Sequence, residues 1–260
     1  MTVLKICSWN VNGLRAAVRT GDFQGWLETS APDIVGMQEV KAMPAQIEES
    51  LWHGFGYHAH WHTAEKAGYS GALLLSKPIP DAVRLGIGVE EFDREGRMIE
   101  ADYGDVTLIT AYFPNAGKKG TPRLDFKLAF CAAFLDHVDA LRSAGRGVVF
   151  MGDLNTAHTE ADLARPDEAL KGTGFLPEER EWIDRFIEHG YVDTFRRFHP
   201  DAREQYTYWD AWRERRARNV GWRIDYVFVS DDLLPRVKHA FIQQEIMGSD
   251  HCPVGIDLEI

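Results

Sequence analysis

Cysteine is scarce in this sequence: three residues, Cys7, Cys131 and Cys252, are spread over 260 positions. Their number is odd, their spacing is wide, and no C-x-x-C pair is present. This pattern argues against a disulfide framework and against a zinc site built on cysteine pairs. We therefore expect reduced thiols in a cytoplasmic enzyme.

Long hydrophobic runs are absent as well. No segment approaches the roughly 18 consecutive apolar residues of a membrane-spanning helix, so we expect no membrane partner. The first residues, Met1-Thr2-Val3-Leu4-Lys5, lead directly into a strand-like segment, and we expect no signal or transit peptide. The hydrophobic fraction of 45% is nevertheless ample for the core of one large domain or two small ones.

An excess of positive charge is also missing, because 29 Lys and Arg residues stand against 40 Asp and Glu residues, for a net charge of −11. An acidic protein is not an obvious nucleic-acid binder. The basic residues are clustered, however. One cluster places four arginines among three tryptophans, and the other is lysine-rich: Arg213, Arg215, Arg216 and Arg218 with Trp209, Trp212 and Trp222; and Lys118, Lys119, Arg123 and Lys127. The first cluster suits a distorted nucleic-acid strand, or else consists of core tryptophans and a solvated helix face.

Short apolar segments rich in β-branched residues predict seven strands: Val3–Asn10, Asp33–Gln38, Gly71–Ser76, Val106–Phe113, Gly147–Asp153, Ile224–Ser230 and Cys252–Ile260. Apolar residues at helical spacing predict helices at Arg123–Ala144 and Pro177–His189. Several strands follow one another without a helix between them, which does not fit a simple βαβ winding. Two mixed sheets packed face to face, with helices outside, fit better.

Acidic residues border three of these strands. Glu39 and Asp153 follow apolar runs, and Asp250 precedes the last strand. Hard cations such as Mg²⁺ take oxygen ligands and keep several waters, so one to three carboxylates suffice for a metal site. A single acid at a strand end is more often a turn cap, but three such acids beside a histidine indicate a hydrolytic site.

His251, next to Asp250, is a candidate acid, base or donor to a phosphate oxygen. Asp225 is a plausible partner for it, because it lies in an apolar run where an unpaired acid would be costly. Further polar groups at strand ends can donate to a phosphoryl oxygen without adding negative charge: the amides of Asn10, Asn115 and Asn155 and the hydroxyl of Tyr112. Each Asn taken alone is more often a turn residue.

With these residues in place, the chain resembles the exonuclease III family of abasic-site (AP) endonucleases, within the endonuclease/exonuclease/phosphatase superfamily. The resemblance covers essentially the whole chain and rests on nine collinear motifs. These are Trp9-Asn10-Val11-Asn12-Gly13-Leu14-Arg15, Gln38-Glu39-Val40-Lys41, Gly68-Tyr69-Ser70-Gly71, Glu95-Gly96-Arg97, Tyr112-Phe113-Pro114-Asn115-Ala116-Gly117, Gly152-Asp153-Leu154-Asn155, Gly174-Phe175-Leu176-Pro177-Glu178-Glu179-Arg180, Val220-Gly221-Trp222-Arg223-Ile224-Asp225-Tyr226 and Ser249-Asp250-His251.

The resemblance implies one catalytic domain over residues 1–260, folded as a four-layered α/β sandwich. It implies Mg²⁺, with Mn²⁺ as an alternative, held chiefly by Glu39, with Asn12 and Asp250 near it and with Asp153 and Asn155 as further candidate ligands. Asp153 would orient or deprotonate the attacking water, and His251, paired with Asp225, would stabilise the phosphate. Asn10, Tyr112 and Asn155 would complete the phosphate cradle.

The resemblance also implies a DNA-facing surface. Tyr208, Trp222 and Ile224 match a small apolar pocket that admits the flipped, baseless sugar. Residues matching DNA-backbone or site-supporting positions are Arg15, Lys41, Tyr69, Arg97, Asn115, Lys118, Arg123, Trp212 and Arg213. The chain departs from the human-type enzymes at Asn12, where they carry Asp, and at Ala169 and Gly172, where they carry Asn. Lys118 replaces an Arg, and the Trp212-Arg213 region replaces a methionine that inserts into the duplex.

These features predict a monomeric, bacterial-type DNA-repair phosphodiesterase that acts on double-stranded DNA at the nucleoid. It would incise the backbone 5′ to abasic sites and would act on blocked 3′ ends as a phosphodiesterase, phosphatase or 3′→5′ exonuclease. One alternative keeps the chemistry and changes the substrate to an inositol phosphate or phospholipid headgroup. The other is a catalytically silent DNA-binding or scaffold protein.

Overall fold

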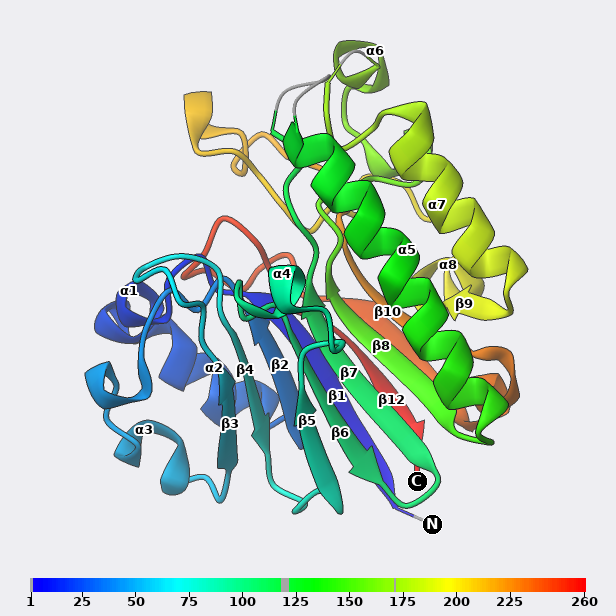
Figure 1. Cartoon of the computed structure of the whole chain (residues 1–260). Helices are drawn as coiled ribbons and strands as arrows, with labels where there is room; N and C mark the ends of the chain where they lie inside the picture. The colour runs from blue at the N-terminus through cyan, green and yellow to red at the C-terminus, as the bar shows by residue number, and fades with distance from the viewer. Residues whose placement is uncertain (1, 118–121, 171) are drawn as a thin grey trace.

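Two six-stranded sheets pack face to face in the computed structural model, which describes residues 2–117, 122–170 and 172–260 (Figure 1). The first sheet has the order β11-β12-β1-β2-β4-β3, formed by Val237–Ile242, Val254–Glu259, Val3–Asn10, Ile34–Gln38, Ala72–Ser76 and His58–His62. The second has the order β5-β6-β7-β8-β10-β9, formed by Ala82–Leu85, Met98–Tyr103, Val106–Tyr112, Gly147–Asp153, Asp225–Ser230 and Tyr191–Asp193.

Helices cover the outer faces of both sheets (Figure 1). The α-helices are α1 Leu14–Thr20, α2 Asp22–Ser30, α3 Ser50–His53, α4 Glu90–Asp93, α5 Pro122–Ser143, α6 Pro166–Ala169, α7 Pro177–Glu188 and α8 Thr194–Phe198. Four 3₁₀ segments accompany them: η1 Pro44–Gln46, η2 Glu160–Asp162, η3 Trp212–Glu214 and η4 Asp231–Arg236. Helices α1 to α3 lie on the first sheet and α5 and α7 on the second, so the predicted four-layered α/β sandwich is confirmed.

The central core lies between the sheets and consists of aliphatic side chains from both, such as Ile6 and Leu74 facing Ile99 and Val149. The sheets approach closely at Gly36, because a Cβ built there would lie 2.4 Å from Thr110 Oγ1. A second core, rich in phenylalanine, lies under α5 and α7. Burial on both faces explains why these strands are short apolar runs without strict alternation.

All seven predicted strands and both predicted helices are present, with ends that differ by at most two residues. Five strands were not predicted: β3, β5, β6, β9 and β11. Their sequences carry histidines or charges inside the strand. In β6, for example, Glu100 is buried and accepts from Arg84 and His137. Such partners lie far away in the sequence, so local hydrophobicity did not indicate a strand.

The two termini lie together at one end of the sheets, and the loops that follow β1, β2, β7 and β8 lie at the opposite end (Figure 1). β1 pairs in parallel with β2, and β7 pairs in parallel with β8. The carboxyl ends of both pairs therefore meet at this edge of the sandwich. Within the described residues, no helix is long and apolar enough to cross a membrane.

Candidate active site

The predicted catalytic side chains converge where the strands of the two sheets end. Asn10 ends β1 and Asp153 ends β8. Tyr112, at the end of β7, and Asp225, at the start of the antiparallel β10, both pair in register with Asp153. The sheet register thus brings residues from four distant parts of the chain to one edge.

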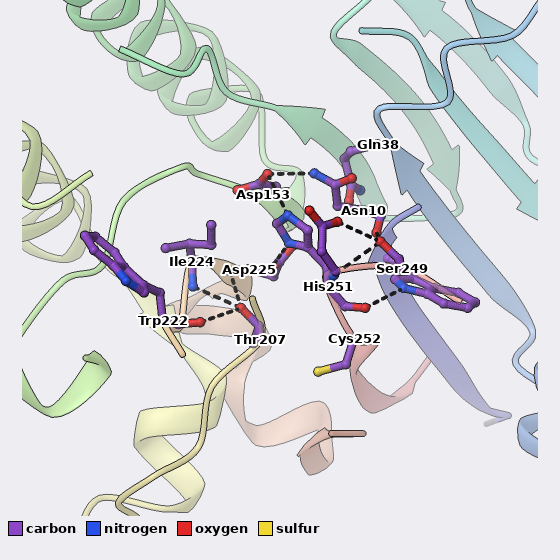
Figure 2. A network of polar contacts seen from close by, with 12 residues as sticks. Asn10, Gln38, Asp153, Thr207, Trp222, Ile224, Asp225, Ser249, His251 and Cys252 are labelled. Atoms are coloured by element: carbon purple, nitrogen blue, oxygen red, sulfur yellow. Dashed lines mark hydrogen bonds and ion pairs between the residues drawn. The ribbon is translucent and has the colours of Figure 1, made fainter. Parts of the chain in front are cut away.

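Asp153, His251 and Asp225 form a buried row of charge (Figure 2). The Nδ1 atom of His251 lies 2.8 Å from Asp225 Oδ2, so the two residues expected to pair are in contact. Its Nε2 atom lies 4.0 Å from Asp153 Oδ2. Asp225 therefore orients the imidazole and directs Nε2 toward Asp153.

The charges in this row shift one another's pKa. Burial alone would lower the pKa of His251, but the nearby carboxylates, chiefly Asp225, outweigh burial and raise it to about 10. Burial, followed by the charge of Asp225, raises the pKa of Asp153 to about 7, against the opposing effect of His251. At neutral pH the imidazole is thus protonated, while Asp153 lies near its titration point, as a general base requires.

Glu39 lies beside this row and is linked to it by Asn10. The buried Asn10 Nδ2 atom donates to Glu39 Oε1 at 3.0 Å and to Asp153 Oδ2 at 2.8 Å. Glu39 also pairs with the ammonium of Lys41 at 2.6 Å. Burial would raise the pKa of Glu39, but the hydrogen bonds from Lys41 and Asn10 offset this and lower it, so the carboxylate is ionised. Asn10, predicted as a phosphate donor, instead bridges two carboxylates here.

Asn12 and Asp250 meet on the exposed side of the site. Asn12 Nδ2 donates to both oxygens of Asp250 at 3.0 Å, and Lys41 Nζ donates to Asn12 Oδ1 at 2.5 Å. Lys41 thus connects this amide–carboxylate pair to Glu39. Ser249 supports the pair by donating to the Asn10 carbonyl and to Asp250.

Oxygen atoms of the candidate ligands suit a hard cation. One ligand atom each from Glu39, Asp153 and His251 lies within 4.8 Å of the other two. Because His251 is protonated and committed to Asp225, the oxygen donors are the fitting ligands. Two carboxylates, with Asn12 and Asp250 adjacent, match the small protein ligand set of a cation that keeps several waters.

Tyr112 is nearly buried, and its hydroxyl donates to Glu39. Burial and the charge of Glu39 raise its pKa well above its ordinary value, so it remains a neutral donor. The Arg97 guanidinium lies 4.7 Å from the Tyr112 ring centroid and donates to the Tyr112 carbonyl. Arg97 is only 2% exposed, so of its two predicted roles, DNA contact and site support, the geometry fits support.

Arg123 and Tyr69 complete this support. The Tyr69 hydroxyl accepts from Arg97 at 3.1 Å and from Arg123 at 2.7 Å, and Glu95 accepts from both arginines. The network fixes the loop before β4 and the start of α5 against β7.

Asn155 lies close to Asp153, but not through the extended geometry that the sequence indicated. β8 ends at Asp153, and Asn155 has a φ of +49°. This turn lets the side-chain Nδ2 of Asn155 donate to Asp153 Oδ2 at 3.3 Å and to the Phe113 carbonyl at 3.1 Å. Its Oδ1 accepts from Asn115 at 3.1 Å, so the two predicted amides are in contact.

Tyr208, Trp222 and Ile224, the predicted residues of the sugar pocket, lie near His251. Tyr208 pairs with both Trp222 and His251 through isolated bridges, and its ring lies 4.8 Å from the imidazole. Trp222 and Ile224 lie on one side of His251 and Asn10 on the other (Figure 2). All three residues pack with Phe175 and Leu163 from the loop after β8. The acidic site therefore adjoins an apolar surface.

Arg15 and Lys41 line a groove of about 510 Å³ beside the site, together with Arg19. This groove provides local positive charge on an acidic molecule. Arg213 is exposed in η3. Lys118 and the side chain of Trp212 lie outside the described residues.

The predicted arginine–tryptophan cluster is divided between surface and interior. Trp209 is buried, and the half-buried Arg216 stacks on it at 4.6 Å. Arg216 donates to the carbonyls of Ser249 and Gln244. It therefore holds the loop that carries Asp250 and His251, whereas the sequence interpretation had assigned all four arginines to one surface.

Two further groups were not identified from the sequence. Lys127 and Glu179 form a buried ion pair beneath Asn155, and Asp162 binds Arg223, the residue between Trp222 and Ile224. Glu179 and Arg223 lie in two of the nine motifs, but nothing local indicated their roles.

Known proteins resemble the chain over its full length. The sequence model of the endonuclease/exonuclease/phosphatase family matches residues 7–251. An exodeoxyribonuclease of Bacillus subtilis is 41% identical over 99% of this chain and 100% of its own length. The DNA repair nuclease APEX1 of Danio rerio is 42% identical, over 99% of this chain and 83% of its own.

A solved 3′ phosphatase from Neisseria, bound to a product DNA hairpin, superimposes with a TM-score of 0.90 at 27% identity and covers 99% of this chain and 100% of its own. The two-sheet sandwich agrees with this likeness. The chain belongs to the endonuclease/exonuclease/phosphatase family, and the relatives that match 99% of it include an exodeoxyribonuclease and a DNA repair nuclease.

Proposed function

We propose that this chain is a Mg²⁺-dependent DNA-repair phosphodiesterase that incises double-stranded DNA 5′ to abasic sites. The observation that carries the proposal is the position of the Asp153–His251–Asp225 row between Glu39 and the apolar surface of Tyr208, Trp222 and Ile224. A base, a protonated donor and a metal ligand there adjoin a surface that fits a sugar lacking its base.

Each charged group has a defined part in the reaction. Asp153 accepts a proton from water as the water oxygen bonds to phosphorus. The P–O3′ bond breaks and the departing O3′ takes a proton from solvent water, which leaves a 3′-hydroxyl on one fragment and a 5′-deoxyribose phosphate on the other. His251, held by Asp225, donates from Nε2 to a phosphoryl oxygen, and Tyr112 and Asn155 provide further neutral donors.

Glu39 would hold a Mg²⁺ ion, with Asn12, Asp250, Asp153 and Asn155 nearby, and the ion would neutralise phosphate charge and lower the pKa of coordinated water. Mn²⁺ has the same preference for oxygen ligands and is the natural substitute. Arg15, Lys41 and Arg19 bind the DNA backbone from the adjacent groove. Arg97, Tyr69 and Arg123 hold the walls of the site.

The 260 residues act as one catalytic domain and as a monomer of 29.5 kDa, in the cytoplasm on nucleoid DNA. Activity on blocked 3′ ends belongs to the same site, since a 3′-phosphate presents the same group to Asp153 and His251. The relatives named for exonuclease and 3′ phosphatase functions support this extension.

The test is a cleavage assay on two labelled duplexes, one with a single internal abasic analogue and one with a 3′-phosphate end, each with Mg²⁺ and with EDTA. We expect Mg²⁺-dependent incision at the internal site. Asp153→Ala, Glu39→Ala and His251→Ala should each lower the rate by about 10²- to 10⁴-fold. Asp184→Asn, which alters an exposed carboxylate paired with His158, is the control and should leave the rate unchanged.

Three results would contradict the proposal. Full activity in all three variants would show that the site is misassigned. Faster hydrolysis of inositol phosphates than of abasic duplex would favour a phosphatase on small phosphoesters. Turnover only at the 3′ end would indicate a 3′-processing enzyme.

A further inference from the structure

A lysine and a glutamate are buried together beneath the candidate site. Lys127 on α5 and Glu179 on α7 have side chains that are 1% and 0% exposed, and their charged atoms lie 2.7 Å apart. Lys127 Nζ also donates to Thr156 Oγ1 at 2.6 Å and to the Asn155 carbonyl at 2.9 Å. All three ammonium protons are therefore used within the protein.

Glu179 makes the complementary contacts with its other oxygen. Oε2 accepts from the backbone nitrogens of Gly174 at 2.6 Å and Leu176 at 3.1 Å. The pair thus joins the start of the loop after β8, at Asn155 and Thr156, to the end of that loop, at Gly174. A direct hydrogen bond from Ala157 N to the Gly174 carbonyl closes the same junction.

Stability alone does not account for this pair. Removing two charges from water costs several kcal/mol per ion, and apolar residues of similar volume are often as stable or more so. The contacts of the pair are directed at backbone groups next to the site. This arrangement is what holding a particular backbone conformation requires.

That conformation carries Asn155. Its φ of +49° is uncommon for a residue other than glycine, and the bond from Lys127 to its carbonyl restrains the peptide. The side chain then reaches Asp153 and the Phe113 carbonyl. Gly174 closes the junction from the opposite side, because a Cβ there would lie 3.3 Å from both the Asn155 carbonyl and the Trp222 ring.

We propose that Lys127 and Glu179 are positioning residues for phosphodiester cleavage, which act by holding the backbone of Asn155 so that its side-chain amide stays beside Asp153, where the phosphate is attacked. This inference rests on the proposed function. It predicts that disruption of the pair slows the chemical step more than it weakens DNA binding, since neither side chain reaches the DNA-facing groove.

The test is a double-mutant cycle between Lys127 and Asn155. Lys127→Met and Asn155→Ala should each lower kcat on the abasic duplex by about 10²-fold, because misplacing a catalytic group by about 1 Å costs that much, while KM changes less. In the Asn155→Ala background, Lys127→Met should lower kcat by only about two-fold, since residues that act through one group are not additive. Lys127→Arg keeps a buried cation and should recover most of the lost kcat.

Glu100→Gln is the matched control. Glu100, on β6 of the second sheet, is also a buried carboxylate. It pairs with Arg84 on β5 and His137 on α5, away from the site. We expect it to lower the melting temperature as Lys127→Met does but to keep kcat within about two-fold, because surface and core changes remote from a site act mainly on stability. A purely structural role for Lys127 would give equal kcat losses in both, or losses that add to that of Asn155→Ala.

Hydrogen exchange separates this proposal from the proposed function. Lys127→Met should speed exchange of the Asn155 and Gly174 amides in the protein alone, without DNA or metal. If the wild type cleaves no abasic DNA, the proposed function fails, yet the exchange result still tests the contact. If Lys127→Met does not fold, Glu179→Gln takes its place in the same cycle, and additive losses there overturn the proposal.

Discussion

Asp153, His251 and Asp225 show how strongly single residues depend on their neighbours at this site. Burial, followed by the charge of Asp225, raises the pKa of Asp153 to about 7, and Asp225, 2.8 Å from His251, outweighs burial and raises the pKa of that imidazole to about 10. Asp153 must be deprotonated to act as the base, so activity is present above its pKa and lost as the pH falls through it. His251 must be protonated to donate, so activity is lost as the pH rises through its pKa.

Asp225→Asn should therefore move both limbs of the pH profile to lower values. Removing the negative charge lowers the pKa of Asp153 and that of His251 together. The check is kcat/KM on the abasic duplex from pH 5 to pH 10.5 at one fixed Mg²⁺ concentration. Asp231→Asn, an exposed partner of Arg142, should leave the profile in place. Limbs that stay fixed or move upward would show that Asp225 does not set these pKa values.

Asn12 offers a second test at this scale, on the metal. Its amide donates to both oxygens of Asp250 and accepts from Lys41. Asn12→Asp replaces that donor with a second negative charge, whose repulsion from Asp250 a divalent cation relieves. We expect Mn²⁺ to bind about ten-fold more tightly, a difference of about 1.4 kcal/mol, as measured by electron paramagnetic resonance. Unchanged or weaker binding would place the metal away from this pair.

At the scale of elements, two loops form one wall of the site. Asp162, in η2, accepts from Arg223 Nε at 2.8 Å and from Arg196 Nη2 at 2.6 Å, and all three charged groups are mostly buried. Arg223 lies between Trp222 and Ile224. The loop after β8 and the segment before β10 are therefore joined by a buried charge network directly behind the apolar surface.

Asp162→Asn should cost about 3–5 kcal/mol of unfolding free energy, because it leaves two buried guanidinium groups short of one negative charge. Burial opposes ionisation, but Arg223 and Arg196 outweigh it and hold the pKa of Asp162 far below its usual range. The wild type keeps this contribution above about pH 4 and loses it as the pH falls further. Denaturant unfolding from pH 3 to pH 7 measures both effects. Asp105→Asn, at an exposed ion pair with Arg236, should change neither.

At the scale of the whole molecule, the net charge of −11 means that DNA binding must depend on a local cluster of basic residues. Among the described residues, Arg15, Arg19 and Lys41 line a positively charged groove beside the site. An overall acidic surface repels DNA elsewhere, which favours release after cleavage and limits non-specific binding.

The affinity for abasic duplex, measured in EDTA, should fall by about 10²-fold between 50 and 200 mM salt, as expected for roughly four neutralised phosphates. Arg15→Ala combined with Arg19→Ala should make the log–log slope shallower by about two, because each lost phosphate contact removes about 0.9. Arg236→Ala, at the ion pair with Asp105, should leave the slope unchanged. A flat response in the wild type would count against DNA as the substrate.

The sequence by itself determined the fold class, the strands that border the site and the chemistry of the residues at their ends. Short apolar runs predict strands directly from the sequence, and Glu39, Asp153 and His251 each follow or precede such a run. The sequence did not indicate the strands whose polar residues pair with partners distant along the chain, such as Glu100 in β6. It also did not indicate that the cations of Arg216 and Lys127 point into the protein.

Only the tertiary structure decided most of the contacts between polar and charged groups. The pairing of Asp225 with His251 could be anticipated, because an unpaired acid in an apolar run is costly. The bridging role of Asn10, the turn at Asn155 and the buried Lys127–Glu179 pair could not. A side chain's sequence neighbours set its solvation only in part, whereas its partners and pKa depend on groups brought close by sheet register and loop closure. These partners lie far apart along the chain. The local sequence pattern could therefore identify the residues of the site, but only the packing of the folded chain fixes their geometry.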